Sequence, residues 1–374
     1  MEKLNFSTLN TVFAGCDAGN GITKVVLAVP KNTQYRFVEA SIPSIVASGR
    51  MSSSAALASN ESLQDKLLEL ISKDGQHFIT ALDMSVPAAA IDALPTGGDV
   101  YQSSLARGAL VYSSILKALN GILDTDLASK GLTCYLAVTT MASNYWLDNG
   151  LRKNTTRIAE VAAALGSTFT TPLPNVTIDI VRTEVFGETL AAMLSLLIDP
   201  RGNTTSPYPD ESQIAVIDVG HTDSVLLVAE IKNGLPKIVK RRSIPMGIGS
   251  AVLDVVANHL SNILGRTISA DLHLLSKPSL RYCGQNIDLL SVQREAVQAL
   301  SLRLLAHISK ELGKGAELEA TYLVGGFPQV ALKLFGYSYF TGYGRIHNLK
   351  VPELPVYANA RGALYGLMQR IARG

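Results

Sequence analysis

One short pattern occurs twice in this sequence and constrains the fold more than any other feature. Each copy is an apolar run that ends in an aspartate, followed by a glycine-containing turn and a second apolar run. The first copy spans Thr11–Val29 with Asp17 at the end of its first run, and the second spans Gln213–Ile231 with Asp218 in the same place. Apolar, β-branched runs around a short glycine turn predict a β-hairpin. Because one copy begins each half of the chain, the pattern predicts two related α/β domains.

A linker separates the two copies. Residues 199–210 are rich in proline, glycine and turn-forming residues and contain almost no apolar side chains. Such a stretch is typical of a domain boundary. A chain of 374 residues is long enough for two domains that each bury a core. We therefore expect a first domain over residues 1–198 and a second over residues 212–354.

Hydrophobic periodicity predicts the elements that follow each hairpin. Strands are expected at Leu132–Met141, Val176–Val181 and Ala320–Val324. Helices are expected at Thr155–Leu165, Val185–Ile198, Val292–Leu312 and Ala358–Arg373, with Gly313 as the stop of the third. Helical spacing also occurs at Leu63, Leu67, Leu68 and Ile71. Strands and helices therefore alternate in both halves, as they do in α/β domains.

The first turn has the composition of a phosphate-binding loop. Its glycines let the backbone approach a ligand, so that N–H groups can surround phosphate oxygens. Lys24 follows the turn and can neutralise phosphate charge, while Asp17 can hold a magnesium ion through its water ligands. The candidate nucleotide-binding residues here are Asp17, Gly19, Asn20, Gly21, Thr23 and Lys24. The alternative is an ordinary hairpin, for which Asn-Gly is a common turn.

Two further segments repeat or complete these features. Asp218 ends a strand and is the second candidate magnesium residue, and the turn after it offers a glycine and a hydroxyl. The candidates in that turn are Gly220, His221 and Thr222. The segment Tyr322–Pro328 ends a strand in paired glycines, against which an adenine and its ribose can lie because no Cβ is in the way. Its candidates are Gly325, Gly326 and Phe327. Each motif alone also fits a plain turn, but the three in this order form a specific set.

The order of phosphate turn, phosphate turn and Gly-Gly turn resembles that of the actin, sugar-kinase and heat-shock-chaperone ATPase superfamily. Within it, the motif from Asp17 to Lys24, Asp-x-Gly-Asn-Gly-x-x-Lys, is similar to bacterial and archaeal actin-like proteins of the ParM and StbA type. The segment Pro355–Gly362 resembles the second hinge of these proteins, where the chain returns to the first domain. The resemblance implies an actin-like fold, in which two related α/β domains have a nucleotide cleft between them and residues 355–374 return to the first.

The resemblance also implies the chemistry. It predicts that the chain binds ATP, with GTP left open, together with Mg²⁺. Relatives place a Glu or Gln just before a helix at the first hinge, where it orients the attacking water. Glu184 fits that position best and Glu188 is the second choice, while Asp218 joins Glu184 as a catalytic candidate. In relatives, a segment after the second hairpin begins a helix beside the ribose, so Gly247 and Gly249 are candidate nucleotide contacts.

Proteins of the ParM and StbA type polymerise with ATP and move DNA through a separate DNA-binding adaptor. The resemblance therefore predicts an ATPase that forms filaments of its own copies for plasmid or DNA segregation. A net charge of +2 gives little drive for direct DNA binding. Candidate subunit contacts are Leu94, Tyr101 and Leu105. Two alternatives stay open, a sugar or metabolite kinase on the same fold and a non-segregation cytoskeletal or scaffold protein.

Cysteine spacing and hydropathy limit the setting. Cys16, Cys134 and Cys283 are far apart in the sequence and lack the spacing of zinc ligands. No run reaches the ~20 apolar residues that a membrane-spanning helix needs, and the N-terminal residues lack the apolar stretch of a signal peptide. We therefore expect a protein of the reducing cytoplasm with no membrane partner.

Overall fold

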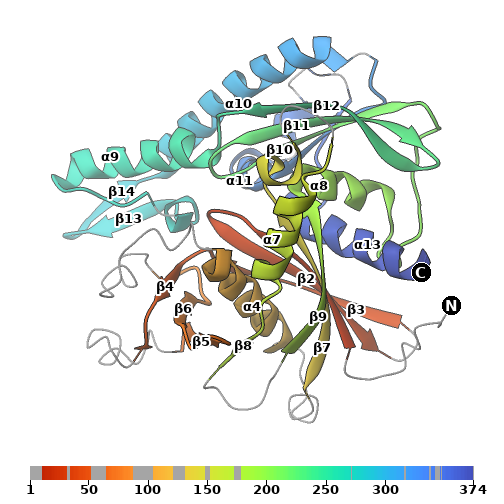
Figure 1. Cartoon of the computed structure of the whole chain (residues 1–374). Coiled ribbons are helices and arrows are strands. Elements are labelled where there is room, and N and C mark those ends of the chain that lie inside the picture. Colours follow the sequence, from red (N-terminus) through yellow and green to blue (C-terminus); the bar gives the residue numbers. More distant parts are fainter. Residues whose placement is uncertain are drawn as a thin grey trace. The chain divides into compact units, whose positions relative to one another are not determined.

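The chain folds into two compact units (Figure 1). Unit 1 contains Met1–Thr205 and Asn359–Gly374, and unit 2 contains Ser206–Ala358. The computed structural model describes residues 11–31, 34–51, 65–86, 104–120, 131–147, 152–171, 178–270, 272–315, 317–336, 338–341, 346 and 348–373.

A five-stranded mixed sheet forms the centre of unit 1. Its strands, in spatial order, are β3 (Gln34–Pro43), β2 (Ile22–Lys31), β1 (Thr11–Ala18), β7 (Leu132–Thr140) and β9 (Ile178–Gly187). The first three are antiparallel neighbours, whereas β7 runs parallel to β1 and β9 runs parallel to β7. The hairpin predicted over Thr11–Val29 is confirmed as β1 and β2.

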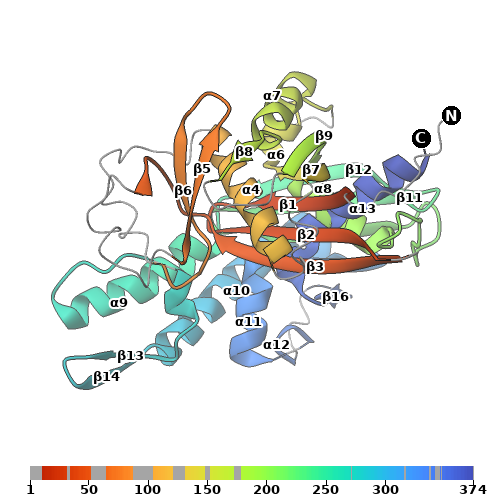
Figure 2. The same ribbon diagram turned by 90° about the horizontal axis from the view of Figure 1, so that it is seen from below.

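Helices cover both faces of this sheet. α4 (Ser104–Asn120) crosses β1, β2 and β3 on one face (Figure 2), where Ser114 hydrogen-bonds to Cys16 of β1. Neighbouring residues of a strand point to opposite faces, so Gly15 faces the other way. On that side α13 (Ala358–Arg373) packs so closely that a Cβ on Gly15 would lie 2.2 Å from the carbonyl oxygen of Ala360. Gly15 is therefore the residue that lets α13 lie directly on β1.

A second, antiparallel sheet belongs to unit 1. Its order is β4 (Val46–Ser48), β6 (His77–Ala81), β5 (Leu67–Ser72) and β8 (Phe169–Thr170). The helix expected from the spacing of Leu67 and Ile71 is wrong, and Leu63 lies outside the described residues. Residues four apart share a face in a strand as well as in a helix, so the spacing alone did not decide between them. Pairing with β6 makes this segment a strand.

The boundary between β9 and the following helix also differs from the prediction. Within the described residues of unit 1, the other helices are α6 (Ala142–Tyr145), α7 (Thr155–Leu165) and α8 (Glu188–Leu197). The prediction that the strand ends at Val181 and the helix begins at Val185 is wrong. β9 pairs with β7 as far as Gly187, which lies opposite Thr140. This pairing extends the strand over polar residues that give no strand signal in the sequence. Of the predicted subunit contacts, Leu105 is half-buried on α4, and Leu94 and Tyr101 lie outside the described residues.

Unit 2 repeats the topology of the large sheet of unit 1. Its strands, in spatial order, are β12 (Leu235–Ile244), β11 (Ser224–Lys232), β10 (Gln213–Val219), β15 (Ala320–Gly325) and β16 (Leu349–Lys350). Again the first three are antiparallel, and β15 and β16 run parallel to β10. The duplicated beginning of the two halves therefore reflects a duplicated sheet.

Helices and a small hairpin complete unit 2. They are α9 (Asp254–Leu264), β13 (Ser279–Tyr282), β14 (Gln285–Asp288), α10 (Leu290–Leu312), α11 (Gly326–Phe335) and α12 (Ser338–Thr341). The apolar residues Ala296, Leu300, Leu304 and Ile308 of α10 are buried in the core of the unit. The helix ends at the predicted stop, Gly313, whose φ of 55° is left-handed. Among the helices of the described ranges, none combines the length and the apolar character needed to cross a membrane.

Candidate functional site

Asp17 is held at the end of β1 by two partners. Its carboxylate is almost fully buried, with Oδ1 accepting a hydrogen bond from Oγ1 of Thr139 at 2.6 Å. Oδ2 forms an ion pair with Nζ of Lys24 at 2.9 Å, and Lys24 lies directly opposite Asp17 in the β1–β2 register. Burial raises the pKa of the neighbouring Cys16 thiol, so Cys16 stays neutral beside this pair. A buried carboxylate with these partners is fixed in position.

Ser44, which follows β3, holds the first turn in shape. Its Oγ donates to the carbonyl oxygen of Gly19 at 2.5 Å, and its N–H donates to the carbonyl oxygen of Gly21 at 3.0 Å. Oγ of Ser44 also lies 2.9 Å from Oγ1 of Thr23. Across a planar trans peptide, an N–H points away from the preceding carbonyl. The N–H groups of Asn20 and Ile22 therefore point away from Ser44. An anion on the side of the turn opposite Ser44 would accept hydrogen bonds from N–H groups in this orientation.

Space at the turn is limited by Lys24. A Cβ on Gly19 would lie 3.3 Å from Nζ of Lys24 and 3.0 Å from the carbonyl oxygen of Ile22. The glycine therefore lets the ammonium group lie against the turn. The side-chain oxygen of Asn20 accepts a hydrogen bond from Nη2 of Arg107 at 3.0 Å. The structure brings all six candidates of this turn together, and the cationic side chains of Lys24 and Arg107 lie at the turn.

The second turn is supported from the segment after β12. The N–H of Ile248 donates to the carbonyl oxygen of Gly220 at 3.1 Å, and the N–H of Gly249 donates to that of His221 at 2.7 Å. A Cβ on Gly247 would lie 2.4 Å from the same His221 oxygen, and one on Gly249 would lie 2.9 Å from Nε2 of the His221 ring. Gly247 and Gly249 are therefore required for this packing, and the structure brings both to the turn with the predicted residues.

The two turns match position by position. Asp17 pairs with Lys24 and Asp218 with Val225, so each aspartate is the penultimate residue of its strand and pairs with the residue seven positions later. The hydroxyl residues after the turns, Thr23 and Ser224, are both fully buried. Ser224 donates to the carbonyl oxygen of Met246 at 2.6 Å, as Thr23 contacts Ser44.

Three of these supporting hydroxyls, at Ser44, Thr139 and Ser224, were not predicted from the sequence. Alignment of the two turns would have found Ser224, because it occupies the place of Thr23. No local signal points to Ser44 or Thr139, which reach the first turn from β3 and β7.

The Gly-Gly segment lies against the second turn. Gly325 has a φ of 94°, and a Cβ on it would lie 2.5 Å from Oδ1 of Asp218 and from the carbonyl oxygen of Val219. Gly326 begins α11, with open space where its Cβ would be. Phe327 was predicted as a nucleotide contact, but its ring is 1% exposed and packs in the core of unit 2. Only its backbone can face a ligand.

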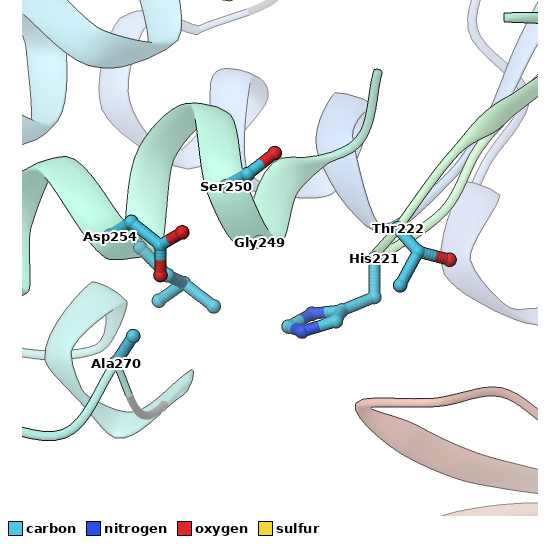
Figure 3. A pocket seen from close by; sticks show the side chains of 7 residues that line it. His221, Thr222, Gly249, Ser250, Asp254 and Ala270 are labelled. Atoms are coloured by element: carbon cyan, nitrogen blue, oxygen red, sulfur yellow. The ribbon is translucent and has the colours of Figure 1, made fainter. Parts of the chain in front are cut away.

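A hollow of about 210 Å³ opens beside the second turn (Figure 3). Its lining residues are His221, Thr222, Gly249, Ser250, Leu253, Asp254 and Ala270. The His221 ring and the Asp254 carboxylate point towards each other from opposite walls. The wall from Gly249 to Leu253 is a π-helical turn, a form often found at functional sites. Ser250 and Asp254 were not predicted from the sequence.

Glu184 lies away from the Asp17 cluster. It belongs to β9, in register with Ala137 and Gly15, two residues before the level of Asp17. Its carboxylate pairs with Arg182 at 2.6 Å and with Arg370 near the end of α13. Arg370 is ten residues after Ala360, the residue that contacts Gly15, and this is about 15 Å of helix. Glu184 was chosen because the sequence predicted a helix that begins at Val185. Strand pairing shifts the start of that helix to Glu188.

Glu188 lies nearer to the end of β1. It is the first residue of α8 and follows Gly187, which pairs with Thr140 of β7. Thr140 is the neighbour of Thr139, whose hydroxyl binds Asp17. The second choice from the sequence is therefore the one that the strand register brings towards the Asp17 cluster.

Comparisons with known proteins identify the fold. Residues 216–330 match the family model described as the C-terminal part of the archaeal MreB-like actin homologues. The structure is similar to a 15-stranded ParM filament from Clostridium botulinum, with a TM-score of 0.66, 16% identity, and coverage of 95% of this chain and 98% of the other. Comparison with curated proteins gives no match.

Two similar structures contain ADP. The archaeal actin homologue Ta0583 in complex with ADP has a TM-score of 0.61 and 18% identity over 97% of this chain and 100% of its own. Bacillus thuringiensis ParM with ADP has a TM-score of 0.64 and 14% identity over 96% of this chain and 99% of its own. The predicted actin-like fold is confirmed. At these identities the likeness concerns the fold.

The contact between Gly325 and Asp218 gives a direct test of the geometry of unit 2. Gly325→Ala should lower the free energy of unfolding by about 2–4 kcal/mol, because it adds left-handed strain and a clash with a buried carboxylate. Gly326→Ala, one residue away, should change it by less than about 1 kcal/mol because its Cβ enters open space at a helix start. Urea denaturation of both variants measures the difference. Equal effects would show that Gly325 does not lie against Asp218.

Proposed function

We propose that this protein binds and hydrolyses a magnesium-bound nucleoside triphosphate, ATP in the first place, and assembles into filaments of its own copies. The observation that carries the proposal is the matched pair of buried aspartates, Asp17 and Asp218, at the penultimate position of the central strand in each unit. Each is followed by a glycine turn whose carbonyl oxygens are held from a neighbouring segment. A stable hairpin does not require a buried aspartate followed by a glycine turn that is held in this way, and this chain contains two such turns.

The residues of both turns fit a nucleotide. In unit 1, the turn from Gly19 to Gly21 and the ammonium group of Lys24 would hold phosphate oxygens through N–H groups and charge. In unit 2, the turn from Gly220 to Thr222 would hold phosphate as well, and the glycines 325 and 326 would lie against the adenosine. We propose that nucleotide binding requires both turns.

Magnesium fits the same residues. Among the described residues, no group of three or more His, Cys, Asp and Glu side chains is arranged around a common point. Magnesium on a nucleotide needs no such group, since it is held by phosphates, waters and one or two carboxylates. Asp17 and Asp218 are the carboxylates that would hold its waters. Bound there, the ion would neutralise charge that develops on the phosphates during hydrolysis.

Hydrolysis of the terminal phosphate depends mainly on positioning and electrostatics. We assign the orientation of the attacking water to Glu188, whose place at the start of α8 follows from the β7–β9 register. Lys24 would stabilise the negative charge on the phosphates from the β2 side. Thr139 would keep the Asp17 carboxylate in a single orientation through its 2.6 Å hydrogen bond.

The similar structures support the rest of the proposal. One of them is a ParM filament and two contain ADP. We therefore propose self-assembly controlled by the nucleotide, in the cytoplasm, with DNA segregation as the task. A separate DNA-binding adaptor would connect the filament to DNA, because a net charge of +2 gives little electrostatic drive for direct binding.

Two glutamate variants separate a water-positioning role from a structural one. Glu188→Gln should lower the rate of ATP hydrolysis by roughly 10²–10⁴-fold while ATP still binds, because a positioned base contributes about that factor. Glu184→Gln is the matched control, and it should keep its hydrolysis rate but melt at a lower temperature because it weakens the pairs with Arg182 and Arg370. Phosphate-release assays and thermal melts distinguish them. A slow Glu184→Gln with a normal Glu188→Gln would reverse our assignment.

Sedimentation tests assembly. Purified protein with Mg-ATP should pellet above a critical concentration and stay in the supernatant without nucleotide, because head-to-tail contact between identical subunits does not close. A parallel series with Mg-GTP measures the nucleotide preference. In a gel-shift assay at 150 mM salt, the protein without an adaptor should not retard plasmid DNA. A monomer that consumes ATP only when a small hydroxylated substrate is added would contradict the filament proposal and favour a kinase.

A further inference from the structure

Three consecutive residues after β4 are each tied to the same two residues of the neighbouring strands β5 and β6 (Figure 1). The N–H of Gly49 donates to the carbonyl oxygen of His77 at 2.9 Å. Nε of Arg50 donates to Nε2 of the His77 ring at 3.1 Å. The N–H of Met51 donates to Oε2 of Glu69 at 3.1 Å. The backbone of this segment and the Arg50 side chain are therefore held by separate bonds.

The bond from Arg50 fixes the protonation state of His77. An arginine Nε always carries its hydrogen and can only donate, so Nε2 of His77 accepts and carries no proton. The neutral ring then has its proton on Nδ1, which lies 2.8 Å from Oε1 of Glu69 and donates to it. The imidazole is therefore a neutral link between a guanidinium on one side and a carboxylate on the other.

A second proton on this ring would break one contact and keep the other. An imidazolium carries a proton on both nitrogens, so Nε2 would become a donor that faces the donor of Arg50. Two positive charges would then lie side by side, at a place where the His77 side chain is only 17% exposed and water screens them incompletely. The contact with Glu69 would become charge-assisted and persist. Histidine is the side chain that ordinarily changes its charge between pH 5 and pH 8.

The other charged groups of the surrounding elements do not bind the ring. Lys73 and Asp74 are exposed in the turn between β5 and β6, and in the described part of the chain neither forms a hydrogen bond or an ion pair with His77. The cations of α4, Arg107 and Lys117, bind oxygens elsewhere. A change of charge on His77 therefore acts on its two described partners, the guanidinium after β4 and the carboxylate of β5.

We propose that His77 is a pH-sensitive latch, which in its neutral form holds the Arg50 guanidinium on the second sheet of unit 1 and releases it on taking up a proton. The release concerns the side chain alone, because the N–H groups of Gly49 and Met51 keep their own acceptors. The surface after β4 thereby changes from a tethered to a free guanidinium as the pH falls. The latch contains no residue assigned to nucleotide binding, so it is independent of the proposed function.

Hydrogen exchange of the Arg50 Nε–H tests the latch, measured by NMR on nucleotide-free protein with labelled arginine and compared with free arginine at each pH. At pH 7.5 this proton should exchange about fivefold more slowly than in free arginine, the factor that one hydrogen bond contributes. At pH 5.5 it should exchange as free arginine does. His77→Gln should remove the change with pH, because its amide oxygen can accept from Arg50 but does not titrate.

The matched control is His307→Gln, which removes an exposed imidazole of α10 and should keep the pH dependence of the wild type. Equal protection of the Arg50 Nε–H at pH 7.5 and pH 5.5 in the wild type would overturn the inference. A pH dependence that persists in His77→Gln would also overturn it, because another group would then be the sensor. The wild-type series decides the question by itself if a variant does not fold.

Discussion

A buried carboxylate at the end of a central strand is the constraint on which each unit depends. Charge inside a protein is costly unless it is paired and hydrogen-bonded, so everything near Asp17 is arranged to provide partners. Thr139 comes from β7 and Lys24 from β2, which fixes the register of three strands at one point. In unit 2, the carboxylate of Asp218 lies against Gly325, where only a residue without a Cβ fits. The two aspartates therefore occupy matching positions on the same topology but have different neighbours.

Close backbone approach is the second requirement, and glycines satisfy it. Gly15 lets α13 lie on β1, and Gly247 and Gly249 let the segment after β12 lie on the second turn. These contacts leave no room to adjust the turns, so the N–H groups in them are oriented before any ligand arrives. Preorganised donors avoid the cost of reorientation during reaction. A stable fold and a prepared phosphate site therefore come from the same contacts.

Much of this could be predicted from sequence because it is local. The two hairpins and the helices α7 and α13 follow from short-range periodicity, and two related α/β domains follow from the repeated aspartate turn. The contact between Gly325 and Asp218 could not be predicted, because it depends on the parallel register of β10 and β15. Ser44, Thr139 and Arg107 are single polar residues without a surrounding motif. Glu184 and Phe327 were chosen for their place in a motif, and strand pairing or core packing gave their side chains other partners.

Our proposal requires both aspartate turns for nucleotide binding, and calorimetric titration of Mg-ATP into the protein measures this requirement. The account predicts one nucleotide per chain, with binding that weakens when magnesium is removed. It also predicts that Asp17→Ala and Asp218→Ala each weaken this same binding event at least tenfold while the folded chain still melts cooperatively. A stoichiometry of two, or full affinity in either variant, would contradict the account.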